Sequence, residues 1–328
     1  MYPFSRLRRL RKYKWLREIV HEYSILASDL ILPIFIVEGT KISEEIKTLP
    51  DVFRFSIDNA ILVAKEAEVY GINAIALFPC LDQSLKTQNG EYAYDADNLV
   101  CRAIKSIKDS GVNIGIICDV ALDPYTLSGH DGIVTDNYVH NDKTINALVK
   151  QSLVLVEAGA DILAPSDMMD GRVSAIREIL EDYNYTDVPI ISYTAKFASS
   201  LYGPFRDAVK SKSMLKNASK KTYQMDPRRS KEARIEADLD AKEGADILMV
   251  KPATFYLDVI KDLSNTQDLP IFAYHVSGEY AMLKFASLNE AINFEDCLIE
   301  SMIAIKRAGA KAIISYGALE AAKIIANH

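Results

Sequence analysis

Cysteine is scarce in this chain, and its spacing excludes two kinds of protein. The four cysteines, Cys80, Cys101, Cys118 and Cys297, lie far apart, and none belongs to a CxxC pair. A disulfide scaffold or a thiolate zinc site needs a closer or paired arrangement. Each cysteine lies in an apolar pattern typical of a strand or helix, so we interpret all four as core residues. Unpaired thiols fit the reducing environment of the cytoplasm.

Long apolar runs and an excess of positive charge are also missing. No segment approaches the length of a membrane span, and the start of the chain lacks the apolar run of a signal peptide. With a formal net charge of −7 over 328 residues, the chain is not expected to bind nucleic acid or membranes. We interpret residues 1–25 as an arm that packs on a neighbouring subunit; a transit peptide, the alternative, would contain more serine. This segment concentrates positive charge at Arg6, Arg8, Arg9, Arg11, Lys12, Lys14 and Arg17.

A GxGxxG sequence is absent after the first predicted strand, which argues against a dinucleotide fold. Instead, short apolar segments rich in β-branched residues predict eight strands, at 30–37, 73–78, 112–119, 161–164, 188–194, 245–250, 270–275 and 312–316. Helical patterns lie at 56–70, 95–110, 143–158, 171–183, 228–243, 254–264, 278–289, 294–308 and the C-terminus, whereas 40–55 and 120–141 are predicted loops.

The predicted strands and helices form a repeat. A glycine ends four of the helices just before a strand, at Gly71, Gly159, Gly244 and Gly309. Continuous apolar strands imply a parallel sheet that is buried on both faces. We therefore predict an α/β fold, a (β/α)8 TIM barrel over residues 26–328 with the N-terminal arm extending from it; a doubly wound open sheet is the alternative.

A lysine follows one of the most apolar predicted strands. Residues 247–250 run directly into Lys251, which precedes Pro252. Loss of hydration there would lower the pKa of the amine towards neutrality and make it a nucleophile for a carbonyl substrate; a lysine that extends out to solvent is the alternative. Lys196 lies at the adjacent strand end, and each ammonium would lower the pKa of the other. The strand ends, where barrel enzymes place catalytic groups, also carry Asp119, Ser166, Asp167, Tyr193, His275, Ser277 and Tyr316.

Five stretches together resemble the porphobilinogen synthase (5-aminolevulinate dehydratase) family: YTAKFASS at 193–200, YGPFRD at 202–207, YQM at 223–225, LMVKPA at 248–253 and HVSGEY at 275–280. The resemblance implies a lyase that condenses two 5-aminolevulinate molecules into porphobilinogen, with loss of two waters, in heme biosynthesis. It also implies a (β/α)8 barrel whose arm wraps a partner, commonly in a homo-octamer.

The resemblance implies roles for particular residues. Lys251 would form the Schiff base with the substrate that becomes the propionate side, and Lys196 would bind the keto group of the second. Ser277 and Tyr316 would hold the first carboxylate and Arg206 the second. Lys220 falls where many members have arginine, although Lys221 could substitute. The excursion over 197–227 would be an active-site lid; the alternative, a disordered surface loop, leaves its Tyr202 and Phe205 unexplained.

The resemblance also bears on metals. Ala121, Asp123 and Asp131 stand where zinc-dependent members have cysteines, so no catalytic zinc is expected, and the chain looks like the aspartate-rich branch. Asp119, Asp123 and Asp131 are left to hold a substrate ammonium, a hard cation or water. Glu236 matches the glutamate that anchors a structural, allosteric Mg²⁺, although an exposed helix face would look the same.

Two rival functions remain. Another class I Schiff-base aldolase would need only one lysine and would usually clamp phosphate. A non-catalytic scaffold or nucleic-acid binder would leave the paired lysines and the acidic balance unexplained.

Overall fold

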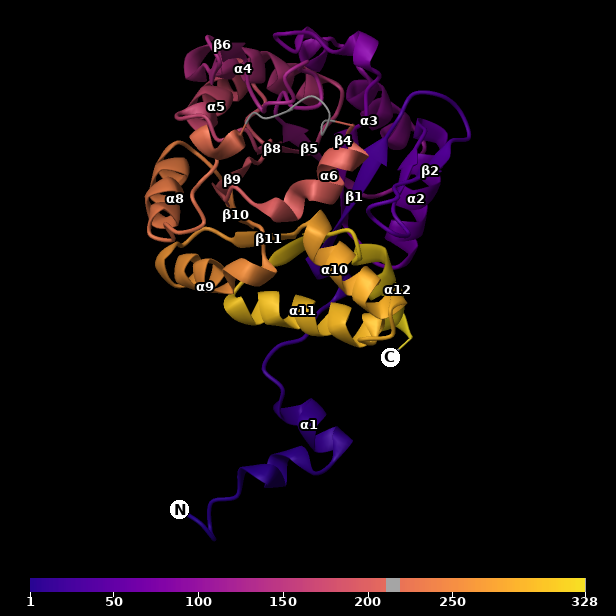
Figure 1. The fold of residues 1–328 in the computed structure, drawn as a ribbon, viewed down its shortest axis with the longest axis vertical. Helices are drawn as coiled ribbons and strands as arrows, with labels where there is room; N and C mark the ends of the chain where they lie inside the picture. The colour runs from indigo at the N-terminus through magenta and orange to yellow at the C-terminus, as the bar shows by residue number, and fades with distance from the viewer. Residues whose placement is uncertain (211–218, 328) are drawn as a thin grey trace.

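The chain folds into a barrel of eight parallel strands, and the computed structural model describes residues 1–210 and 219–327. The barrel order is β8-β5-β4-β1-β12-β11-β10-β9, and a bridge between Leu163 and Ile190 joins the two ends. All eight predicted segments form strands, so the TIM-barrel prediction is confirmed and the open sheet is wrong (Figure 1). The strands are β1 (Leu30–Ile36), β4 (Ala74–Pro79), β5 (Gly115–Val120), β8 (Ile162–Pro165), β9 (Ile191–Lys196), β10 (Ile247–Lys251), β11 (Ile271–His275) and β12 (Ala312–Ser315).

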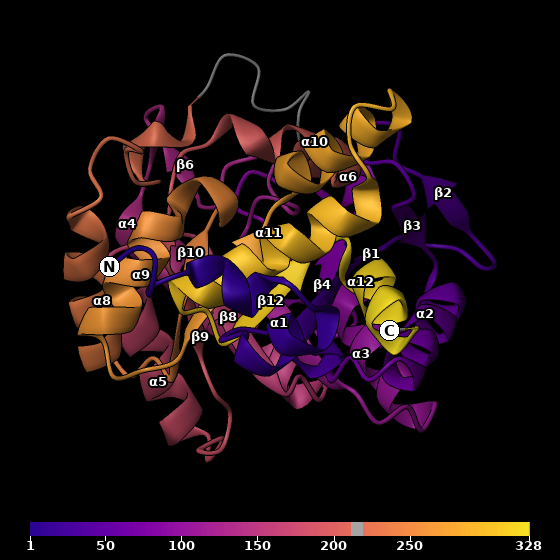
Figure 2. The same cartoon turned by 90° about the horizontal axis from the view of Figure 1, so that it is seen from below.

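Helices form the outer layer (Figure 2). The four junction glycines all have positive φ, from +81° to +121°, a conformation that glycine adopts without strain and that turns the chain from helix to strand. The helices of the outer layer are α2 (Ile57–Val69), α3 (Leu99–Asp109), α4 (Asn141–Glu157), α5 (Arg172–Asp182), α8 (Glu232–Lys242), α9 (Leu257–Thr266), α11 (Phe294–Ala308) and α12 (Ala318–Ala326). Two further helices, α6 (Gly203–Ala208) and α10 (Ser277–Leu288), pack on each other.

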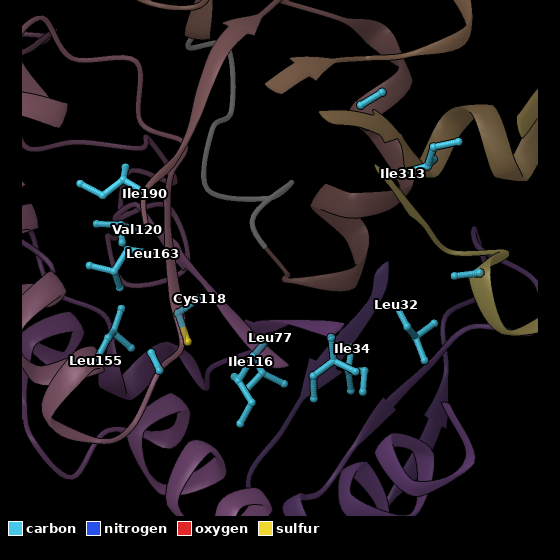
Figure 3. Close-up of a cluster of buried hydrophobic side chains, with 14 of the residues drawn as sticks. Leu32, Ile34, Leu77, Ile116, Cys118, Val120, Leu155, Leu163, Ile190 and Ile313 are labelled. Atoms are coloured by element: carbon cyan, nitrogen blue, oxygen red, sulfur yellow. The ribbon is translucent and has the colours of Figure 1, made fainter. Parts of the chain in front are cut away.

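Alternation along the strands divides the core into two layers. In β1, Ile31 and Phe35 point into the barrel, whereas Leu32 and Ile34 pack outward against the helices. The outer layer of the core, between the strands and the helices, also contains Cys118, which is fully buried (Figure 3). Cys80 and Cys101 are buried as predicted, whereas Cys297 is only half-buried.

An irregularity in β9 changes which side chains face the interior. Leu248 of β10 pairs with Ser192, but Val250 pairs with Ala195, so β9 contains one extra residue. Tyr193 points into the barrel and Ala195 packs outward. The bulge therefore returns the next residue of β9, Lys196, to the interior.

Some sequence predictions of local structure are wrong. The predicted loop 40–55 contains β2 (Ser43–Glu45) and β3 (Phe53–Phe55), which pair with each other, and β3 also pairs with β1. The predicted loop 120–141 contains a hairpin of β6 (Val134–Thr135) and β7 (Tyr138–Val139). Helices expected to begin at 95 and 228 begin at Leu99 and Glu232. In α3 the cause is Asn98, whose side chain accepts from the Cys101 N–H and caps the helix there.

The first residues extend away from the barrel (Figure 1). They form η1 (Leu7–Arg11) and α1 (Lys14–Val20), neither of which has a buried residue within the described structure. Large apolar side chains are exposed there, among them Leu7, Tyr13 and Trp15. Across residues 1–210 and 219–327, no helix has the length and apolar character needed to cross a membrane.

Candidate active site

The C-terminal ends of the strands surround a pocket. Lys196 and Lys251 are register partners at the ends of β9 and β10, so the bulge places two amines side by side. Nine of the twelve residues predicted for the site line this pocket; Ser277, Tyr316 and Glu236 do not. The pocket is lined by Phe78, Asp119, Asp123, Asp131, Ser166, Lys196, Tyr202, Phe205, Arg206, Lys220, Gln224 and Lys251.

Aromatic rings surround the Lys251 amine, which is buried in the pocket. Its Nζ lies 4.3 Å from the ring centroid of Tyr274 and 5.0 Å from that of Tyr193. The rings of Tyr202 and Phe205 are each 5.4 Å away. Burial, and then the neighbouring Lys196 ammonium, lower the pKa of Lys251 from 10.5 to about 7. A large fraction of this amine is therefore neutral, and hence nucleophilic, at neutral pH.

Lys196 has a polar environment instead. Its Nζ donates to Asp131 Oδ1 at 2.8 Å and to the carbonyl oxygen of Ser166. The two lysines thus differ in their partners although their backbones are adjacent: one amine faces rings and the other faces oxygen atoms. Two amines in different surroundings suit a reaction in which two carbonyl groups are treated differently.

Asp131 is a shared counter-ion. Its second oxygen lies 2.8 Å from Lys220 Nζ and accepts a 2.7 Å hydrogen bond from Tyr223. Burial opposes ionisation of this carboxyl, but the Lys196 and Lys220 ammonium groups outweigh it and hold the pKa of Asp131 well below its usual range. Lys220 also lies 3.2 Å from Asp123, and it is buried. Because Lys221 is exposed, Lys220 is the lysine that reaches the pocket.

Asp119 presents a carboxyl of a different kind. Its Oδ1 is buried and has no hydrogen-bond partner among the described residues. Burial raises the pKa of Asp119 to about 7, although the nearby Lys196 opposes this shift. A carboxyl that is half-protonated near neutral pH can both accept and donate a proton.

The segment after β9 forms one wall of the pocket. The Tyr202 hydroxyl donates to the carbonyl oxygens of Phe197 at 2.7 Å and Lys251 at 3.2 Å, which fixes its ring beside the amine. Phe205 packs edge-on against Phe78, with ring centroids 5.6 Å apart. Arg206, next to Phe205 on α6, also lines the pocket.

Ser277 and Tyr316 do not line this pocket in the part of the chain that the structure describes. The Ser277 hydroxyl accepts from the N–H of Phe205 at 3.0 Å and donates to the carbonyl of Leu201 at 3.2 Å. The Tyr316 hydroxyl is 3.0 Å from that of Tyr274. Both predicted carboxylate ligands are thus bonded to protein groups beside the pocket. Leu201 approaches closely because its neighbour is Gly278, where a Cβ would lie 2.5 Å from the Leu201 oxygen.

Glu236 lies apart from the pocket, on α8 in the outer layer, and it is half-buried. Burial raises the pKa of Glu236 to about 7; Arg172 opposes this shift and Asp240 adds to it. Within 1–210 and 219–327, no group of three or more His, Cys, Asp or Glu side chains is arranged to hold a metal ion.

Sequence reasoning missed several functional positions. Tyr274, whose ring is the closest to the Lys251 amine of those described, lies inside β11 rather than at its end. Its inward position follows from the alternation of the strand, but a tyrosine inside an apolar strand is equally typical of a core residue. Gln224 and Tyr223 belong to the YQM stretch, yet no physical argument from the sequence assigned them a contact.

The fold and the site are those of a (β/α)8-barrel enzyme suited to carbonyl substrates. Residues 4–324 match the family model of delta-aminolevulinic acid dehydratase. The delta-aminolevulinic acid dehydratase of Bradyrhizobium diazoefficiens is 48% identical over 97% of this chain and 90% of its own length. That of Rhodobacter capsulatus is 44% identical over 99% and 97%.

A solved structure agrees with these relatives. The delta-aminolevulinic acid dehydratase (porphobilinogen synthase) of Toxoplasma gondii, in complex with the reaction product porphobilinogen, is 46% identical. It has a TM-score of 0.95 and matches 98% of this chain and 91% of its own. The chain belongs to the delta-aminolevulinic acid dehydratase family and is a lyase of porphyrin and heme biosynthesis. The aldolase and scaffold alternatives are therefore wrong.

Substitution by methionine should raise the Tm at Lys251 and lower it at Lys196. Lys251→Met removes an amine whose charged form is costly to bury, so we expect a higher Tm at pH 7, by the equivalent of roughly 1–4 kcal/mol. This gain should shrink as the pH rises from about 7 towards 10.5, because the unfolded chain then also loses the proton. Lys196→Met leaves Asp131 without one cation and should lower the Tm.

Thermal unfolding of the three proteins between pH 6 and pH 10 measures both effects. A Lys251→Met protein that is less stable than the wild type at pH 7 would show that the amine is held by favourable contacts rather than desolvated.

Proposed function

We propose that the pocket condenses two 5-aminolevulinate molecules to porphobilinogen, with release of two waters, through Schiff bases on Lys251 and Lys196. The observation that carries the proposal is the pair of buried amines at the same level of adjacent strands, one among rings and one among carboxylates. Family membership supplies the reaction, and the geometry supports a different role for each lysine.

Lys251 is the amine that attacks the first keto group, that of the substrate which becomes the propionate side. Its pKa of about 7 leaves the nitrogen lone pair available at neutral pH. Attack forms a C–N bond, and loss of the former keto oxygen as water gives the imine. The rings of Tyr202 and Phe205 keep solvent from this bond, which would otherwise hydrolyse.

Lys196 binds the keto group of the second substrate, the acetate side. Its contact with Asp131 places a carboxylate within hydrogen-bond distance of the amine that must lose protons during imine formation. Asp119 supplies a carboxyl that can exchange protons near neutral pH. Asp119, Asp123 and Asp131 are the carboxyl groups of the pocket that a substrate ammonium would contact.

The substrate carboxylates need cations and hydroxyl donors. Arg206 and Lys220 line the pocket on the side of α6, and we assign them the second carboxylate. Lys220 would release one of its two carboxylate partners and bind the substrate carboxylate instead. Its ammonium is a compact charge and lacks the planar fork of an arginine guanidinium. Ser277 and Tyr316 would exchange their protein partners for the first carboxylate. The proposed lid, about 197–227, carries Tyr202 and Phe205; its residues 211–218 lie outside the described residues.

The metal requirements follow from the donor atoms. Asp123 and Asp131, at two of the positions where the family's zinc ligands are expected, bind ammonium groups, and Ala121 offers no ligand atom. Cys118 is buried in the outer core. These features favour the zinc-independent branch. Glu236 is the residue we assign to a structural, allosteric Mg²⁺, which it would hold as a single carboxylate completed by waters.

Self-association is supported by the arm. Residues 1–25 expose apolar rings and aliphatic side chains that a partner subunit would cover, and we propose a homo-octamer in the cytoplasm. The small-molecule substrate is the only other partner we propose.

Incubation with 5-aminolevulinate and Mg²⁺ should yield a pyrrole that gives colour with an acidic aldehyde reagent. Borohydride added during turnover should attach substrate mass to Lys251, because reduction makes its imine permanent. Peptide mass spectrometry locates the label, and Lys251→Met is the matched control. Folded protein that forms no pyrrole would contradict the function; label confined to other lysines would contradict the role of Lys251.

Metal removal should separate the two proposed metal roles. A zinc-selective chelator should leave the rate unchanged, since no thiolate site is present among residues 1–210 and 219–327. Glu236→Gln should weaken any response to Mg²⁺ by about tenfold in the half-saturating concentration, with Glu232→Gln as the control on the same helix. Strong inhibition by the zinc chelator, or an unchanged Mg²⁺ response in Glu236→Gln, would contradict these assignments.

A further inference from the structure

The second strand of the β2–β3 hairpin, which the sequence did not predict, has a buried arginine at its centre that contacts the active-site wall. We infer that Arg54 is a positioning residue: it fixes the C-terminal end of α6 and thereby holds Phe205 beside the Lys251 amine and Arg206 in the lining of the pocket. The inference rests on the proposed function, because it assigns a purpose to the wall of that pocket.

Arg54 is 5% exposed, and each of its three guanidinium nitrogens donates a hydrogen bond. Its Nε donates to the carbonyl of Ala208 at 2.6 Å, and its Nη2 donates to the carbonyl of Asp207 at 2.8 Å. These are the last two residues of α6, where helix carbonyls run out of intrahelical donors. The Asp207 carbonyl also accepts from the N–H of Lys210 at 3.1 Å, so Arg54 is its second partner. A cation at this end also complements the partial negative charge of the helix. The third group, Nη1, donates to Glu44 on β2 at 2.8 Å.

The hairpin itself is anchored to the barrel. Arg54 pairs in register with Phe35 of β1. The loop between the two hairpin strands is bound to α10, through a hydrogen bond of 3.1 Å from the Tyr280 hydroxyl to the Pro50 carbonyl and an ion pair of 2.8 Å between Lys284 and Asp51. A further hydrogen bond, from Thr48 Oγ1 to Asp207 Oδ2 at 2.7 Å, joins the same loop to α6. The hairpin is thus a fixed support between the barrel and α6.

The supported helix carries two pocket residues within one turn of the bonded carbonyls. Phe205 lies against Phe35 and Phe78, and its ring is 5.4 Å from the Lys251 amine. If α6 shifts, this ring moves and water reaches the amine. The pKa of Lys251 would then rise towards its ordinary value, since burial is the main cause of its depression.

The other groups that face Lys251 lie outside α6, although Tyr202 directly precedes that helix. Burial raises the pKa values of the surrounding phenols of Tyr193, Tyr202 and Tyr274 well above their ordinary range, so they stay neutral. The charged groups that act on the amine are Lys196 on β9, Asp119 on β5, and Asp123 and Asp131 in the loop after β5.

The test compares Arg54→Met, Arg54→Lys and Thr48→Val with the wild type. In Arg54→Met we expect kcat/KM to fall about 10- to 100-fold, as small misplacements of active-site groups do. The acid limb of its pH profile should move upward by about half a pH unit or more, because Lys251 becomes hydrated. Arg54→Lys, which can remake one carbonyl bond, should recover part of both changes. Thr48→Val changes no charge and should move the limb in the same direction by a smaller amount.

Arg177→Met is the matched control. Arg177 also donates to backbone carbonyls, those of Val188 and Gly244, but these precede β9 and β10 at the opposite end of the barrel. The Arg177→Met substitution should lower the Tm and leave the pH profile of the activity unchanged. The inference is overturned if Arg54→Met is folded and keeps the wild-type KM and acid limb, or if Arg177→Met moves the limb equally. Should Arg54→Met fail to fold, an unmoved limb in Thr48→Val overturns it. A wild type that forms no porphobilinogen would instead refute the proposed function.

Discussion

The reactivity of the site requires that water be excluded from one amine, that of Lys251. Lys251 occupies an inward position of β10, in step with Met249, and the barrel therefore directs its side chain among rings instead of into solvent. That placement costs stability in the charged state, and the same cost keeps the amine neutral and reactive. The walls of the pocket can be understood from this requirement: Tyr202 and Phe205 cover the amine, and the hairpin behind α6 holds the cover in place.

Lys196 shows how a small backbone irregularity creates the second half of the site. Without the extra residue in β9, the alternation from Tyr193 would have turned Lys196 outward. The bulge instead brings its ammonium beside Lys251, where it helps to lower the pKa of that amine. Asp131 then prevents the accumulation of positive charge, because it pairs with both Lys196 and Lys220. The carboxylates at the expected zinc positions thus have a structural partner that is not a metal ion.

The sequence was sufficient for the barrel, because eight continuous apolar strands separated by helices leave few other folds. It was also sufficient to bring Lys196, Lys251 and the aspartates to one edge, since the carboxyl ends of parallel strands meet there. It could not reveal the β2–β3 hairpin, whose strands are three residues long and partly polar, below the length at which alternation is recognisable. Nor could it show that Arg54 contacts α6, because that contact spans more than 150 residues of chain and leaves no periodic signal.

The pKa of Lys251 can be measured in the substrate-free protein. The rate of reductive methylation at Lys251, followed by peptide mass spectrometry from pH 5 to pH 11 and normalised to the exposed lysines of the arm, reports the fraction of neutral amine. The structure predicts a midpoint near pH 7, where burial and Lys196 place the pKa of this amine. A midpoint near the ordinary value of 10.5 would contradict it, and with it the account of why this lysine, among the rings of Tyr193 and Tyr274, is the one that reacts.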